Sequence, residues 1–518
     1  MPDTKRDSHK IVVNTAILLT RLVLATIIAL VSTRIVLQAL GNADFGIFSL
    51  ISGLILMLAF LNAALGVSTQ RFLSYYHGIG DLPLLRKVFT NSLFLHIVMG
   101  LFIVVLMQVV GYFLFNGVLN ILPDRIHAAK LIYQFTALAF FFNLISVPFT
   151  GVLAAHENQL WSAIVNMIES VCKLAIAYYL FFVHGDRLIV YGLLMASILV
   201  VKCVLFAGFC FRKYPECTVK GLFRLDKTFI RALASFAGWN LFGIACSLGR
   251  FQGLAIVLNR FYGTVANAAY GISNQIGTQL NYMSESLLVA VNPQIMRSEG
   301  LGNRRRMMGL AMLASKFGSL IMAAFSIPIL FEISSILHLW LKEAPPNTVA
   351  FCSFTILAIL VNQQTVGLQS AVQAIGKIRL YQIVIGSLMV LNLPVAYLLL
   401  YLGFKSYWAI LIFVVVEAVA CIFRMFFLRA LADMSIKEYG KKVFLRQIVP
   451  TLVSVFVCFV CTHLLHFQWR WSVTIVVSCS FFAVSVYFFG MEKQEKDMLH
   501  ELILNIKVKY LKRFLPKG

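Results

Sequence analysis

The stretch that decides the fold runs from residue 88 to residue 114 and reads VFTNSLFLHIVMGLFIVVLMQVVGYFL. It contains no Asp, Glu, Lys or Arg, and as a helix it is long enough to cross about 30 Å of hydrocarbon. Similar apolar runs recur along all 518 residues, of which 60% are hydrophobic and 13% charged. A water-soluble core cannot absorb so much apolar surface. The chain is therefore predicted to be an all-α polytopic membrane protein.

Fourteen segments have the length and composition of a transmembrane helix. The first of them follows a short polar lead without a small-residue cleavage site, so we expect it to stay in the protein as an uncleaved span. The expected spans are residues 14–37, 45–68, 88–114, 131–153, 160–182, 188–210, 232–258, 264–290, 309–333, 348–372, 380–402, 407–428, 448–466 and 472–489.

The basic residues indicate the orientation of these spans. Most of the 44 Lys and Arg fall in loops on the N-terminal side of the membrane, which is the positive-inside pattern. Trp340, Trp408, Trp469 and Trp471 fall at the opposite ends, where aromatic rings favour the headgroup layer. We therefore predict a multi-pass inner-membrane protein with both termini in the cytoplasm. The net charge of +23 reflects this topology and does not indicate a nucleic-acid partner.

Short patterns return after about 220 residues and predict an internal repeat. Residues 35–37 (IVL) return at 256–258, residues 78–81 (GIGD) return as GLGN at 300–303, and Val152 and Ala154 return as Val372 and Ala374. Two six-helix lobes follow, because repeats of this kind are common in transporters. The predicted organisation is an N-lobe at 1–211, a cytoplasmic linker at 212–231, a C-lobe at 232–430, a helix pair at 445–490, and a basic amphipathic tail at 491–518 that lies on anionic lipid.

Polar side chains inside the spans are candidates for a binding cavity, because hydrocarbon excludes them. At about 100° per residue, the polar residues of the eighth span project into an arc of about 60°. We expect a water-lined cavity there, while hydrogen bonding between helices is the alternative. The predicted polar lining is Asn274, Thr278, Asn281, Asn362 and Gln369.

Charged residues inside the spans predict the chemistry of this cavity. Guanidinium and ammonium groups replace the water that a phosphate loses on entry, so Arg21, Arg250, Lys173 and Arg34 are the candidate substrate-binding cations. Arg21 could instead extend toward the cytoplasm, and Lys173 could be neutralised by Glu169 one turn earlier. Glu417 could form a structural pair with Arg424. The candidates for coupling to H⁺ or Na⁺ are Glu169, Glu285 and Glu417.

No segment predicts an enzyme, a metal site or a cofactor. There is no Walker loop, and no extramembrane segment is long enough to hold a catalytic domain. Cys458 and Cys461 form a CxxC within an apolar span and lack a redox context.

Several motifs carry a resemblance to a known family. They are residues 34–37 (RIVL) followed by 40–41 (LG) and 44–46 (DFG), residues 69–74 (TQRFLS) running to 80–81 (GD), residues 292–295 (NPQI), and 339–341 (LWL) before Pro345. The chain resembles the polysaccharide-transporter (Wzx-like flippase) branch of the multidrug/oligosaccharidyl-lipid/polysaccharide exporter superfamily, over nearly its whole length.

This resemblance implies two six-helix bundles, a cationic cavity, and export of undecaprenyl-diphosphate-linked oligosaccharide for capsule or O-antigen. It implies that cavity arginines engage the diphosphate, with Arg21 and Arg250 as the nearest matches by position. It further implies that the last helix pair forms a groove for the polyprenyl tail. A polysaccharide polymerase or glycosyltransferase is a candidate partner.

Three other functions stay open at this stage. A cation-coupled multidrug exporter of the same fold needs acidic residues in its cavity, and the first span has Arg21 and no carboxylate. A cell-wall lipid-intermediate flippase is chemically close to the favoured function. A membrane scaffold for glycan assembly would not need a solvated stripe on the eighth span.

Overall fold

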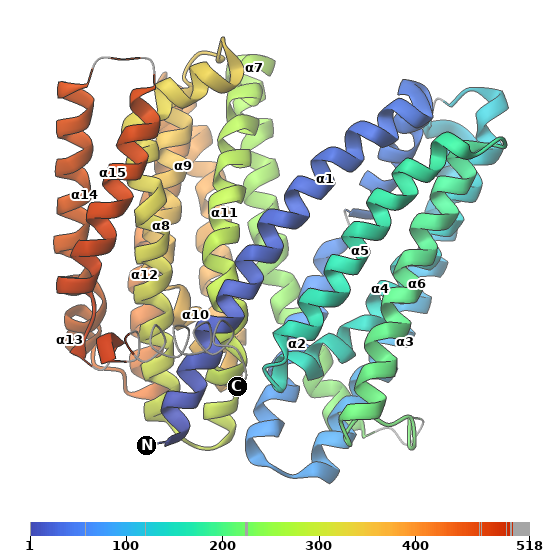
Figure 1. Ribbon diagram of the computed structural model, residues 1–518, viewed down its shortest axis with the longest axis horizontal. Coiled ribbons are helices and arrows are strands. Elements are labelled where there is room, and N and C mark those ends of the chain that lie inside the picture. The colour runs from blue at the N-terminus through green and yellow to red at the C-terminus, as the bar shows by residue number, and fades with distance from the viewer. Residues whose placement is uncertain are drawn as a thin grey trace, which may run out of the picture. The chain divides into compact units, whose positions relative to one another are not determined.

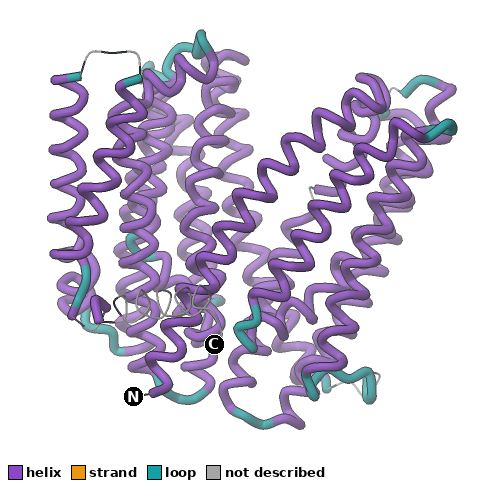
Figure 2. Tube along the Cα trace, viewed as in Figure 1, coloured by secondary structure: helices purple, strands orange, loops and turns teal. Residues whose placement is uncertain are grey.

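The computed structural model describes residues 2–500 except 57, 120, 223–225, 466, 468, 494, 498 and 499. Within these residues all regular structure is helical, as Figure 2 shows. The predicted basic tail helix lies mostly beyond residue 500, outside the described residues, as does the centre of the predicted linker. The all-α fold class is confirmed.

Fifteen α-helices make up most of the described chain (Figure 1). Their bounds are α1 Pro2–Leu56, α2 Ala59–Ile79, α3 Leu82–Phe113, α4 Ile126–Ala155, α5 Gln159–Tyr179, α6 Arg187–Lys213, α7 Lys227–Gly300, α8 Arg304–Leu341, α9 Thr348–Gln363, α10 Val366–Ile375, α11 Arg379–Tyr401, α12 Tyr407–Ala432, α13 Ile436–Tyr439, α14 Leu445–Leu464 and α15 Arg470–Ser485.

The described residues contain 11 helices long and apolar enough to cross a membrane, or 12 if the bent pair α9–α10 counts as one span. The chain is therefore a multi-pass membrane protein. The predicted count of fourteen spans stays a prediction.

The chain forms two compact units. We call residues 16–244 with 296–302 the N-terminal unit, and residues 1–15, 245–295 and 303–518 the C-terminal unit. The last turn of α7 thus belongs to the N-terminal unit, although most of that helix belongs to the C-terminal unit. The predicted lobe boundaries stay a prediction.

The longest helices each contain one sharp kink at a glycine. Gly41 in α1 has φ 79° and ψ 170°, and Gly263 in α7 has φ 69° and ψ −165°. Only glycine adopts this conformation without strain, which explains why each helix breaks at that residue. The two kinks are 222 residues apart (263 − 41), which matches the spacing of the repeated sequence patterns.

A second pair of repeated glycines makes a close contact within the N-terminal unit. A Cβ atom on Gly78 of α2 would lie 2.3 Å from the Arg297 carbonyl oxygen, and one on Gly300 of α7 would lie 2.0 Å from the Tyr75 carbonyl oxygen. Residues 78 and 300, and residues 75 and 297, are again 222 apart (300 − 78 and 297 − 75). The two copies of the glycine motif therefore pack against each other reciprocally, and we call this contact the glycine clasp.

Charged and aromatic side chains lie beside the glycine clasp. His156 Nε2 contacts Glu216 Oε1 at 2.5 Å, and the rings of His77 and His156 lie 4.3 Å apart. Arg297 Nη1 lies 3.6 Å from Glu157 Oε1. The pKa of His77 is lowered to about 4, mainly by burial and to a smaller extent by the nearby His156 and Arg297. Burial alone would raise the pKa of the Glu216 carboxyl group. The hydrogen bond with His156 and the charge of His156 together have a larger, opposite effect, so the pKa of Glu216 lies below its usual value.

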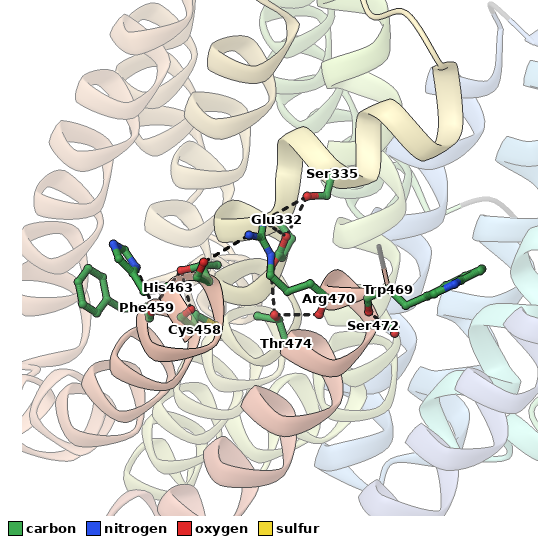
Figure 3. Close-up of polar contacts among 10 residues, drawn as sticks. Glu332, Ser335, Cys458, Phe459, His463, Trp469, Arg470, Ser472 and Thr474 are labelled. Carbon is green, nitrogen blue, oxygen red and sulfur yellow. Dashed lines mark hydrogen bonds and ion pairs between the residues drawn. The ribbon is translucent and has the colours of Figure 1, made fainter. Parts of the chain in front are cut away.

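The last helix pair is fastened to α8 by a buried carboxylate (Figure 3). Glu332 of α8 is fully buried and accepts hydrogen bonds from Arg470 Nε at 3.0 Å and Arg470 Nη2 at 3.0 Å. Thr474 Oγ1 and Ser335 Oγ donate to the same carboxylate at 2.9 and 3.0 Å. Arg470 also donates to the Thr462 carbonyl at the end of α14. Glu332 and Arg470 together thus join three helices.

A buried cation of α8 is also paired. Lys316 Nζ lies 2.5 and 2.6 Å from the two carboxylate oxygens of Glu495, which follows α15 in the sequence. Lys316 is therefore neutralised within the C-terminal unit.

Candidate functional site

The C-terminal unit contains a partly open cavity of about 470 Å³ between α7, α9, α11 and α12. The kink at Gly263 folds α7 so that both of its arms reach this cavity, and Tyr270 of the second arm donates to the Phe251 carbonyl of the first at 3.3 Å. The lining includes Ser247, Arg250, Gln252, Asn274, Thr278, Asn281, Thr355, Asn362, Phe413 and Glu417.

Six residues predicted from sequence meet in this cavity. Arg250, Asn274, Thr278, Asn281, Asn362 and Glu417 all line it. They come from α7, α9 and α12, so the fold brings together positions as far apart as 250 and 417. The C-terminal unit thus brings these polar and charged residues to one cavity, and their predicted roles in binding or coupling stay predictions.

The polar residues along one face of α7 have two kinds of neighbour, the cavity and helix α9. Asn274, Thr278 and Asn281 face the cavity, and Asn281 Oδ1 accepts from Gln363 Nε2 at 3.5 Å. Gln363 in turn accepts from Ser284 Oγ at 2.6 Å. This face therefore combines cavity lining with hydrogen bonding between α7 and α9, the two alternatives that the sequence left open.

Two guanidinium groups share the carboxylate of Glu417, which lines the cavity together with Arg250. Arg250 Nη1 lies 2.8 Å from Glu417 Oε1, and Arg424 Nη2 lies 3.4 Å from Glu417 Oε2. All three side chains are buried, with residue exposures of 6, 4 and 1% for Arg250, Glu417 and Arg424. Because arginine stays protonated in proteins, this triad carries a net charge of about +1 when Glu417 is ionised. We call these three residues the arginine triad.

Neighbouring groups hold the arginine triad in place. Asn362 Nδ2 donates to Glu417 Oε2 at 2.8 Å, and Arg424 Nη1 donates to Thr365 Oγ1 at 3.1 Å. The Arg250 guanidinium lies over the Phe413 ring at 4.8 Å, a cation–π contact. The buried Nε atoms of both arginines have no hydrogen-bond partner among the described residues. The triad therefore keeps donor capacity that the protein itself does not use.

The N-terminal unit has a comparable arrangement built from lysines. Glu169 of α5 contacts Lys173 Nζ at 2.6 Å and Lys202 Nζ of α6 at 2.8 Å. Arg21 interacts electrostatically with the same carboxylate. Lys173 also lines a separate cavity of about 570 Å³ with Ser32, Ser49, Ser52, Ser170 and Tyr191. Two lysines thus bind one carboxylate, and the predicted Glu169–Lys173 pair is formed.

The remaining predicted residues lie elsewhere. Arg34 and Glu285 are exposed, and Gln369 is half-buried on α10. None of the three is among the residues that line the two cavities described above. Their predicted roles stay predictions.

Sequence reasoning missed two charged residues and the second contact of a third. It did not single out Lys202 or Glu332, although each is an isolated charge inside an apolar span and could have been found by that signal. Arg424 was considered only as a pair for Glu417, because its second role beside Arg250 depends on the contact between α7 and α12.

No family model matches the chain, and no curated protein matches it. Solved structures do match. A MATE structure in complex with MaD3S has a TM-score of 0.71 at 13% identity, covering 82% of this chain and 97% of the other. A MOP superfamily transporter from Pyrococcus furiosus, described as having a binding pocket of reverse polarity, has a TM-score of 0.70 at 14% identity over 83% and 96%.

A third match is the MATE transporter ClbM in complex with Rb⁺, with a TM-score of 0.68 at 14% identity over 83% of this chain and 96% of that one. The chain therefore has a MATE-like fold.

Proposed function

We propose that this membrane protein, which has the fold of the MATE transporters, is an exporter of lipid-linked oligosaccharide. It moves an undecaprenyl-diphosphate-linked repeat unit of capsule or O-antigen from the cytoplasmic to the periplasmic leaflet of the bacterial inner membrane by alternating access. No catalytic step is needed, because the substrate changes leaflet without a covalent change.

The observation that carries the proposal is the net positive charge of the arginine triad, two of whose members, Arg250 and Glu417, line the 470 Å³ cavity. A buried charge without a counter-ion costs several kcal/mol, and Glu417 can balance only one of the two arginines. A phosphate group supplies the missing negative charge and accepts hydrogen bonds from the Arg250 guanidinium, which lines the cavity. The cavity therefore suits an anionic head group.

The rest of the lining suits a carbohydrate. Asn274, Thr278, Asn281 and Asn362 offer amide and hydroxyl groups that exchange hydrogen bonds with sugar hydroxyls. Phe413 and Phe251 add apolar ring surface at the same wall. A phosphorylated sugar thus meets both kinds of partner within one cavity.

A multidrug exporter is the second candidate, because the fold is shared with MATE transporters and Glu285 offers an exposed carboxylate. Cationic drugs need net negative charge in the site, whereas both carboxylates beside the described cavities are each surrounded by two or more cations. The Pyrococcus furiosus protein indicates that pocket polarity varies within this fold. These charges favour the anionic substrate.

A cell-wall lipid-intermediate flippase would carry the same diphosphate and is distinguished by its sugar. Deletion of the gene in the native host separates the two functions. We expect a lipid-linked repeat unit of a surface glycan to accumulate on the inner leaflet. Accumulation of the cell-wall precursor would assign the protein to wall synthesis, and accumulation of neither would contradict both flippase functions.

Replacement of Arg250 tests the site itself. We expect Arg250→Ala to lower surface glycan strongly and to weaken binding of the head group about 10- to 100-fold, since a charged hydrogen bond contributes about 1.5–3 kcal/mol. Arg250→Lys should keep part of the activity. Arg260→Ala is the matched control, because Arg260 is exposed on the same helix and does not line the cavity.

Membrane insertion is followed by blotting of the membrane fraction for every variant. Normal glycan export by well-inserted Arg250→Ala protein would overturn the proposed role of the cavity.

A further inference from the structure

The Arg250 guanidinium is bound to Glu417 and is also open to a ligand in the cavity, and one contact can form only at the expense of the other. Arg250 lines the cavity, where a ligand can reach it, and its Nη1 atom is bound to the Glu417 carboxylate at 2.8 Å. Glu417 lines the same cavity. An incoming anion that forms a two-pronged contact with this guanidinium must therefore compete with Glu417 for it.

Displacement would not leave Glu417 without partners. Its Oε2 atom receives hydrogen bonds from Asn362 Nδ2 at 2.8 Å and from Arg424 Nη2 at 3.4 Å, and both belong to the oxygen that Arg250 does not touch. Only the bond from Arg250 to Oε1 has to break. The geometry thus allows Oε1 to be freed while the other oxygen stays anchored.

The charges decide what happens to the freed oxygen. With Glu417 ionised, the arginine triad carries about +1, and a diphosphate diester that carries about −2 would leave the site at about −1. A second anion beside a buried carboxylate favours the protonated acid. One proton on Glu417 brings the site with its ligand back to about zero.

The other groups around Glu417 do not supply this compensation. Arg424 stays protonated and Asn362 does not titrate. Tyr381 of α11 and Cys421 of α12 lie in electrostatic contact with the triad, and Tyr270 of α7 lies near Arg250, but all three are neutral acids that could only lose a proton. Within the triad and these neighbours, Glu417 is the one group able to accept a proton near neutral pH.

We propose that a phosphate or diphosphate group entering this cavity displaces Glu417 from Arg250, and that Glu417 then takes up one proton from the water of the cavity. The N–H···O bond from Arg250 to Oε1 breaks, bonds from Arg250 to a phosphate oxygen form, and an O–H bond forms at Glu417. This inference rests on the proposed function, and it makes binding of the anion an event coupled to proton uptake. Release of the anion returns the proton to water.

The test is calorimetric titration of the purified full-length protein in nanodiscs. The probes are inorganic pyrophosphate and, in a second arm, geranyl diphosphate, which separates a free anion from a lipid-linked one. Each titration is repeated in buffers of different ionisation enthalpy, which gives the number of protons exchanged on binding. Because the probes also titrate, the count is read as the difference between the wild-type protein and Glu417→Gln.

We expect wild-type protein to take up about one proton more than Glu417→Gln. Glu417→Gln should also bind the probe about 10-fold more tightly at pH 8, because no carboxylate competes for Arg250, and its affinity should change less with pH. Glu417→Asp keeps the acid and should keep the proton uptake, which makes the test independent of whether the Gln variant folds well.

Equal proton counts in wild-type and Glu417→Gln protein, or weaker binding by Glu417→Gln, would overturn the inference while leaving the proposed function standing, provided that Arg250→Ala still weakens binding. If neither probe binds, both the inference and the anionic site of the proposed function are contradicted. Preference for geranyl diphosphate over pyrophosphate supports a lipid-linked ligand, and equal binding supports recognition of the phosphate groups alone.

Discussion

Single charged residues inside apolar runs are the strongest functional signal in this sequence, but they do not reveal which residues pair with them. An Arg, Lys or Glu inside an apolar run is visible without any structure, which is how Arg250, Lys173 and Glu417 were identified. Their partners are not visible in this way. Glu417 lies 167 residues from Arg250 in the sequence, and only the packing of α12 against α7 and α9 brings the two together. The sequence therefore predicts which residues are unusual, but not which charge each one balances.

His77 provides a prediction on pH dependence at this scale. Its pKa is about 4 in the folded protein and about 6.5 in an unfolded chain, so below pH 6.5 the unfolded state binds a proton that the folded state does not. Its contribution to stability is complete above pH 6.5 and is lost as the pH falls toward 4. The lowered pKa of Glu216 acts in the same direction.

Thermal unfolding of the protein in detergent, followed between pH 7.5 and 4, measures this effect. We expect the unfolding temperature to fall with pH, and to fall less steeply in His77→Gln. An identical slope in the variant would show that His77 is not responsible.

Helices are the scale at which sequence reasoning was most successful, because the hydrophobic stretch of each span is a local property. The predicted span 131–153 lies within α4, and the predicted span 160–182 begins one residue after the start of α5. The kinks at Gly41 and Gly263 were not predicted, since a glycine in an apolar run does not by itself reveal a positive φ. Their common spacing of 222 residues (263 − 41) would have been a usable signal.

The contact between Glu332 and Arg470 gives a prediction about the last helix pair. Arg470→Ala leaves the fully buried Glu332 carboxylate without its cation, which costs on the order of 3 kcal/mol. We expect α14 and α15 to separate more readily from α8, measured as faster hydrogen exchange in residues 470–485. Ser480→Ala is the control, because Ser480 is exposed and bonds only within its own helix.

The double variant Glu332→Leu with Arg470→Leu removes both charges together and should recover most of the lost protection. Protection in Arg470→Ala equal to that of the wild-type protein would contradict the fastening role.

The glycine clasp leads to a prediction at the same scale. A Cβ on Gly78 or Gly300 would meet a backbone oxygen that cannot move away alone, so either Ala variant should destabilise the N-terminal unit by about 1–3 kcal/mol. Gly309→Ala is the matched control, because nothing lies within 4 Å of its added Cβ, and alanine favours a helix over glycine. Limited proteolysis after residue 300 reports on the contact.

We expect faster cleavage in the two clasp variants and no increase in the control. Since the contact is reciprocal, the double variant Gly78→Ala with Gly300→Ala should cost less than the sum of the single variants. Unchanged cleavage in both single variants would show that the backbones are not held at this distance.

At the scale of the whole molecule, charge distribution and repetition are the informative features of the sequence. The repeat spacing predicted from short patterns returns in the backbone, in the kinks of α1 and α7 and in the glycine clasp. It could be predicted because duplicated segments keep the residues that special conformations require. The cavity of the C-terminal unit could not be placed from sequence, because its walls come from four helices spread over residues 247–417.

The orientation of the chain in the membrane is the prediction that belongs to this scale. Lys and Arg concentrate in alternate loops, and translocation of such loops is disfavoured, so the loop at residues 342–347 should face the periplasm and residues 214–222 the cytoplasm. Alkaline phosphatase fused within 342–347 should then be active, and the same enzyme fused within 214–222 should be inactive. A fluorescent protein at the C-terminus should be bright. An error of one span reverses the side of every later loop. Activity at 214–222 with inactivity at 342–347 would therefore reverse the whole topology, whereas activity at both sites would reveal an even number of crossings between them.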